Sequence, residues 1–123
     1  SHILEHFTWR DTEKVLGEWF RVLKQGGILW LSVPDLDAWI DLYLKCGKIY
    51  GQFLRELVHG GQNYAGNIHL ESFNFRSLSG TLSKVGFRRT DRLKQLPYGL
   101  NDCSALVDTI TKTEISINVK AVK

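Results

Sequence analysis

The sequence of 123 residues contains no methionine, two prolines and two cysteines. Because a translation start would supply a methionine, we expect the chain to have been processed, trimmed or taken from a longer reading frame. Cys46 and Cys103 lie far apart and form no C-x-x-C pair, which excludes a redox motif of that type. The N-terminus also lacks a secretory signal. We therefore expect two reduced thiols and a cytoplasmic protein.

Long apolar runs are also missing, since none approaches the roughly 20 residues that a membrane-spanning helix needs. The apolar fraction of 43% and the charged fraction of 24% predict one soluble domain, residues 1–123. The net charge is only +3. Basic residues gather at Arg88, Arg89, Arg92 and Lys94, but no aromatic residues alternate with them. This pattern favours a solvated strand face over a nucleic-acid site.

The spacing of apolar residues predicts an α/β fold, in which helices and strands alternate along the chain. Helices are expected at about 9–23, 36–58 and 75–85. Strands are expected at about 28–33, 87–94 and 113–122. The first strand is a nearly continuous apolar run, which is typical of a strand buried on both faces. The last one alternates strictly between apolar and polar residues.

Two places in this pattern could carry a site. Asp35 follows the first strand, and ligands of open α/β sheets bind beyond the carboxyl ends of strands. The alternative, which the sequence favours, is that Asp35 caps the next helix, although both roles can coexist. The irregular segment 60–72 is long enough to be functional. In it, His69 with nearby Glu71 could act as a general base, or both could be surface residues.

The first residues, SHILEHF, contain H-x-x-E-H, a signature of zinc proteases. On a helix, His2 and His6 would share a face, and Glu71 would be the third protein ligand beside the catalytic Glu5. Protease families with this motif are, however, much larger than 123 residues. We therefore expect no metal and interpret the stretch as a turn whose polar residues face a cleft or water.

Four stretches carry a resemblance: SHILEHF, EWFRVLKQGGILWLSVPD, FNFRSLSGTLSKVGF and ISINVKAVK. Together they resemble the C-terminal half of a class I S-adenosylmethionine-dependent methyltransferase. SHILEHF resembles the segment after the fourth strand of that fold. EWFRVLKQGGILWLSVPD, with its R-V-L-K-x-G-G turn, resembles the helix and fifth strand. FNFRSLSGTLSKVGF resembles the helix before the sixth strand, and ISINVKAVK resembles the seventh strand. The resemblance implies a partial Rossmann-like fold with a small mixed sheet, in which the last strand lies antiparallel between the other two.

The resemblance also implies a function. The full-length product would transfer a methyl group from S-adenosylmethionine to an unknown acceptor. Ser1, His2 and His6 would border the methionine end of the cofactor, and Asp35 and Tyr64 would lie near the acceptor. His69 and Glu71 would remain the catalytic candidates.

The half of the fold that holds most of the cofactor is absent from this sequence. Gly26 and Gly27 do not replace its glycine-rich loop, because they follow a helix and precede a strand. We therefore expect the isolated chain to bind no cofactor and to be inactive.

A second interpretation is a free-standing, non-enzymatic module for dimerisation or binding. In the methyltransferase fold the strand at 28–33 has a neighbour, the fourth strand, which this chain lacks. Exposed strand edges recruit partners through their unpaired backbone groups. We therefore expect a homodimer formed through this edge or through adjacent apolar faces.

Overall fold

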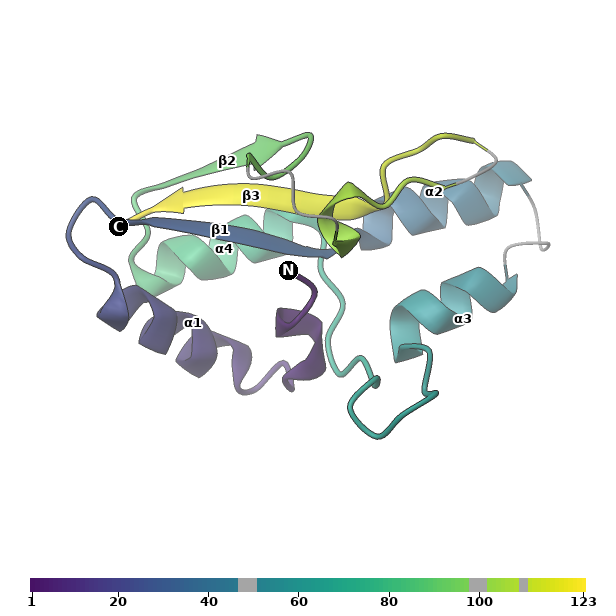
Figure 1. Ribbon diagram of the computed structural model, residues 1–123, viewed down its shortest axis with the longest axis horizontal. Helices are drawn as coiled ribbons and strands as arrows, with labels where there is room; N and C mark the ends of the chain where they lie inside the picture. Colours follow the sequence, from purple (N-terminus) through teal and green to yellow (C-terminus); the bar gives the residue numbers. More distant parts are fainter. Residues whose placement is uncertain (47–50, 98–101, 109–110) are drawn as a thin grey trace.

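The computed structural model describes residues 1–46, 51–97, 102–108 and 111–123 (Figure 1). These residues form a mixed α/β structure with a three-stranded sheet and four α-helices. The helices are α1 (Thr12–Val22), α2 (Leu36–Cys46), α3 (Gly51–His59) and α4 (Phe75–Val85), with the short 3-10 helices η1 (Leu4–His6) and η3 (Cys103–Ala105). The strands are β1 (Ile28–Pro34), β2 (Arg89–Leu93) and β3 (Ser116–Val122).

The predicted elements agree with these bounds to within a few residues. The helix predicted at 75–85 is confirmed as α4, where Asn74 and Ser77 form the capping box and Gly86 follows. The region predicted as helical at 36–58 contains α2 and α3. Gly47, at which the sequence pattern predicts an interruption of this helical region, lies outside the described residues.

The strand order is β1-β3-β2, so the C-terminal strand lies between the other two, as expected. Ile28 is opposite Val122 in the first pairing, and Arg89 is opposite the same residue in the second. Both pairings are antiparallel, which corrects the expectation of a mixed sheet. The reason is that β3 runs against both neighbours and separates the two strands that share a direction.

Helices α1 and α4 pack together on one face of the sheet (Figure 1). The core consists of apolar residues from these elements and from the adjoining loops: Leu4, Leu16, Leu31, Val33, Phe73, Leu78, Leu82, Phe87, Ile117, Val119 and Ala121. The first residues of β1 are exposed or half-buried, so the strand is not buried on both faces along its length. Antiparallel sheets permit this, because one face can pack on the core while the other meets water.

Beyond the carboxyl end of β1 the chain turns directly into α2, and α3 lies beneath α2 (Figure 1). The segment 60–72 then returns from α3 to η1, where Leu70 and Glu71 donate backbone hydrogen bonds to the Glu5 carbonyl oxygen. This return brings the N-terminal residues, the end of β1 and the long loop to one end of the sheet.

Candidate functional site

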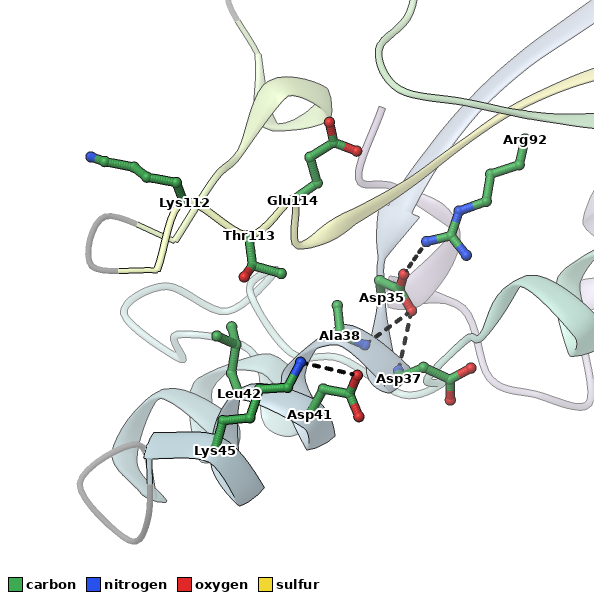
Figure 2. Close-up of a pocket in the computed structure, with 10 residues that line it drawn as sticks. All are labelled: Asp35, Asp37, Ala38, Asp41, Leu42, Lys45, Arg92, Lys112, Thr113 and Glu114. Atoms are coloured by element: carbon green, nitrogen blue, oxygen red, sulfur yellow. Dashed lines mark hydrogen bonds and ion pairs between the residues drawn. The ribbon is translucent and has the colours of Figure 1, made fainter.

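Two clefts lie beyond the carboxyl end of β1. The smaller, the histidine cleft, has a volume of about 190 Å³ and is lined by His2, Pro34, Trp39, Glu56, Leu57, His69, Leu106 and Ile115. The larger, the acidic cleft, has a volume of about 470 Å³ (Figure 2). It is lined by Asp35, Asp37, Ala38, Asp41, Leu42, Lys45, Arg92, Lys112, Thr113 and Glu114.

His2 is held in the histidine cleft by both its backbone and its ring. Its backbone N–H donates to the Ser32 carbonyl oxygen at 2.8 Å, on the outer edge of β1. Its ring Nε2 lies 3.1 Å from Ser116 Oγ on β3, and its Nδ1 lies 3.3 Å from Glu5 Oε1. The N-terminal segment therefore lies beside β1. His2 and His6 do not share a helix, because η1 spans only residues 4–6.

His69 reaches the same cleft from the long loop. Its backbone N–H donates to the His59 carbonyl oxygen, and its ring Nδ1 donates to the Leu57 carbonyl oxygen at 2.5 Å. The loop approaches α3 closely at Gly60, where φ is +75° and an added Cβ would lie 2.5 Å from the Asn67 carbonyl oxygen. From the sequence, His2 is predicted at the cofactor rim and His69 in the loop near the acceptor. The fold brings both residues to one cleft.

Glu71 has a different environment from His69. Its Oε2 accepts a hydrogen bond from Thr12 Oγ1, at the start of α1. Burial raises the pKa of the Glu71 carboxyl, and the hydrogen bond from Thr12 partly opposes this shift. His69 is hydrogen-bonded to α3, and Glu71 is hydrogen-bonded to α1. Neither bond joins the two residues into the His–Glu pair that was considered as a general base.

The remaining predicted residues lie in other places. His6 Nδ1 donates to the Ile68 carbonyl oxygen at 3.0 Å, and its ring meets the His69 ring edge-on. Ser1 is exposed at the N-terminus. Tyr64 is exposed in the loop and is not among the described residues that line either cleft.

Asp35 lines the acidic cleft but is fully engaged with neighbouring groups (Figure 2). Its Oδ1 accepts from the backbone N–H groups of Asp37 and Ala38, as the N-cap interpretation predicted. Its Oδ2 accepts from Arg92 Nη2 of β2 at 2.5 Å. Sequence reasoning missed this partner, because Arg92 read as one more cation of a solvated strand face.

A scan against models of protein families found no match to this chain, and a search of curated proteins found none either. None of the helices formed by the described residues has the length and apolar character that a membrane span requires. Both cysteines are free thiols.

Proposed function

We propose that the chain is the C-terminal part of an S-adenosylmethionine-dependent methyltransferase, whose full-length product methylates a small or macromolecular acceptor. One observation carries the proposal. His2, from the segment that resembles the rim of the cofactor pocket, shares a cleft with His69, from the loop expected to cover the acceptor. The cleft lies beyond the carboxyl end of β1, where ligands of open α/β folds bind.

Two further features support the same proposal. The C-terminal strand lies antiparallel between the other two, as the resemblance implies. The N-terminal segment bonds to the outer edge of β1 through His2 and Ser32. In the methyltransferase fold the preceding strand occupies that edge.

The described residues supply only a rim for the cofactor. The histidine cleft of about 190 Å³ is smaller than the roughly 300 Å³ at which ligand pockets begin. Gly26 and Gly27 lie between α1 and β1, so they do not aim backbone N–H groups from a strand–loop–helix turn at a ligand. We therefore propose that the isolated chain does not hold the cofactor and is inactive.

Calorimetric titration tests this statement about the isolated chain. S-adenosylmethionine added to the 123-residue chain is expected to give no binding in the micromolar range. A micromolar dissociation constant would contradict the proposal that the cofactor needs the missing half.

Reading the DNA upstream of the codon for Ser1 tests the enzyme itself. A continuous frame that encodes a strand and a glycine-rich loop supports the methyltransferase.

In that longer product, His2→Ala is expected to weaken cofactor binding at least tenfold, or about 1.4 kcal/mol. The matched control is His59→Ala, at the exposed end of α3. Equal cofactor affinity in the two variants would show that His2 does not contact the cofactor.

The second candidate is a free-standing module that acts by dimerisation. It is favoured by exposed apolar side chains on two adjacent segments: Ile3 and Phe7 beside η1, and Ile68 and Leu70 in the loop. The hydrogen bonds from His6 to Ile68 and from Leu70 to Glu5 hold these segments together. An in-frame start codon close to the codon for Ser1 would support this module over the enzyme.

As the sequence predicted, we propose that the protein is cytoplasmic and that it does not bind nucleic acid. Free thiols at Cys46 and Cys103 suit the proposed cytoplasmic location. Arg89 and Arg92 each form an ion pair, with Asp91 and Asp35 respectively. These pairs reduce the positive charge available on β2, which supports the proposal that nucleic acid is not the ligand.

A further inference from the structure

A second cluster of titratable side chains lies where η1 meets the long loop. Glu5, His6 and His69 each bring one possible ligand atom to within 4.8 Å of those of the other two. The centroids of the two imidazole rings are 5.1 Å apart, and the ring planes make an angle of 69°. Backbone hydrogen bonds from Leu70 and Glu71 to the Glu5 carbonyl oxygen fix the two segments beside each other.

The two histidines have the backbone hydrogen bonds that metal-binding histidines usually have. Nδ1 of His6 faces the Ile68 carbonyl oxygen, and Nδ1 of His69 faces the Leu57 carbonyl oxygen. Because a carbonyl oxygen only accepts, each Nδ1 carries the proton, and Nε2 of each neutral ring keeps its lone pair. A backbone carbonyl bonded to the second ring nitrogen is the usual support of a metal-binding histidine.

Glu5 supplies an independent indication of a ligand. Its side chain is 1% exposed, and neither carboxylate oxygen accepts a hydrogen bond within the described part of the chain. His2 Nδ1 lies 3.3 Å from Oε1, an ion-pair distance without hydrogen-bond geometry. Burying a carboxylate without hydrogen bonds to its oxygens costs free energy. A bound cation would supply the missing favourable interaction.

We propose that Glu5, His6 and His69 bind a divalent transition-metal ion such as Zn²⁺. Two imidazoles and one carboxylate are a known three-ligand zinc set that leaves a fourth position for water or substrate. The imidazoles disfavour Mg²⁺ and Ca²⁺, which take oxygen ligands. With bonds of about 2.0–2.1 Å, ligand atoms of a tetrahedral site lie about 3.3 Å apart, so ligand atoms now within 4.8 Å of one another approach by up to about 1.5 Å on binding.

This set differs from the H-x-x-E-H reading, in which the ligands were His2, His6 and Glu71. The ring of His2 is instead held between Ser116 and Glu5, so it supports the carboxylate from outside the site. The carboxylate of Glu71 bonds to Thr12. The site does not depend on the proposed methyltransferase function, because each of its ligands belongs to this chain.

Calorimetric titration of Zn²⁺ into the metal-free 123-residue chain tests the proposal. One ion per chain is expected to bind, and Mg²⁺ is expected to bind at least tenfold more weakly. His6→Gln and His69→Gln are each expected to weaken Zn²⁺ binding at least tenfold. His59→Gln changes an exposed histidine, and Cys103→Ser removes an exposed thiol, so both controls are expected to bind as the wild type does.

Two further measurements separate metal binding from damage to the fold. Circular dichroism of each metal-free variant establishes that it is folded. The visible spectrum of the Co²⁺-loaded chain is expected to show a four- or five-coordinate ion, and His69→Gln is expected to abolish that spectrum. Unchanged Zn²⁺ affinity in folded His6→Gln and His69→Gln would overturn the site, as would an equal loss in His59→Gln or Cys103→Ser.

Discussion

Two buried carboxylates near the end of β1 have opposite environments. Asp35 accepts hydrogen bonds from two backbone N–H groups and from Arg92. Glu5 is equally buried, yet within the described residues its oxygens accept none. A buried charge with satisfied bonds is structural, whereas one without them points to a missing ligand. Because of this contrast, we interpret Asp35 as the cap of α2 and propose Glu5 as a metal ligand.

Arg92→Gln tests the structural role of the Asp35 pair. The change leaves the Asp35 carboxylate buried without its cation, so we expect the free energy of unfolding to fall by about 1–2 kcal/mol, measured by urea denaturation. The side chain of Arg92 is 49% exposed, which keeps the loss below that of a fully buried pair. Arg89→Gln is the control, because Arg89 is 74% exposed and its pair with Asp91 contributes less than about 1 kcal/mol. Equal losses in the two variants would contradict this role.

Glu71 makes stability depend on pH in a defined direction. Burial raises the pKa of its folded-state carboxyl above the ordinary 4.5, so the unfolded chain loses this proton first as pH rises. The contribution of Glu71 is therefore fully present below pH 4.5 and is lost as pH rises through the folded-state pKa. Glu71→Gln cannot ionise and is expected to be more stable than the wild type at pH 7. In urea unfolding, this advantage should shrink toward pH 4, and parallel curves would contradict it.

Among the helices, two glycines have opposite roles. Gly17 lies inside α1, where an added Cβ would meet no atom within 4 Å. Gly86 ends α4 with φ of +122°, and an added Cβ would lie 3.1 Å from the ring of Phe20. The ring of Phe20 in turn packs edge-on against Phe87. Only Gly86 is therefore required by the packing of α1 against the end of α4.

Alanine substitutions at the two positions are expected to shift stability in opposite directions. Gly17→Ala should raise the free energy of unfolding by about 0.5–1 kcal/mol, because alanine loses less backbone entropy in a helix. Gly86→Ala should lower it by about 1–3 kcal/mol, because the left-handed backbone is strained for any residue with a Cβ. Thermal or urea unfolding measures both. Stabilisation by Gly86→Ala would show that α4 can end in another way.

At the scale of the whole molecule, β1 is an edge strand that is covered only in part. His2 bonds to Ser32 near its carboxyl end, while Ile28 at the other end is exposed. An apolar edge of this kind favours pairing with a second copy. We keep the homodimer as a proposal that concerns this edge and its adjacent apolar faces.

Sedimentation equilibrium tests the dimer. The wild-type chain is expected to dimerise, and Ile28→Lys is expected to weaken the dimer at least tenfold, because a charge on an edge strand opposes pairing. Leu44→Lys is the matched control, since Leu44 is 71% exposed near the end of α2, which follows the opposite end of β1. A well-folded wild-type monomer at high concentration would end the proposal. Equal weakening by the two lysines would move the interface away from β1.

Long-range contacts are what the sequence could not reveal. The end of α1 illustrates this, because the amine of Lys123 donates to the carbonyl oxygens of Phe20 and Leu23 from the far end of the chain. Lys24, which directly follows this helix end in the sequence, is the cation that a local pattern favours there. No local pattern identifies a partner 100 residues away.

The sequence by itself determined the helices and strands, because apolar periodicity, the Asn74 cap and the glycine stop are local signals that act within a few residues. The family resemblance also supplied the strand order that the sheet adopts. Tertiary structure decided which side chains meet. It separated His69 from Glu71, joined Arg92 to Asp35 across 57 positions and closed Glu5, His6 and His69 into one cluster. The cluster forms where the loop after α3 bonds to η1, and the Arg92–Asp35 pair forms between β2 and the end of β1, neither of which any spacing along the chain encodes.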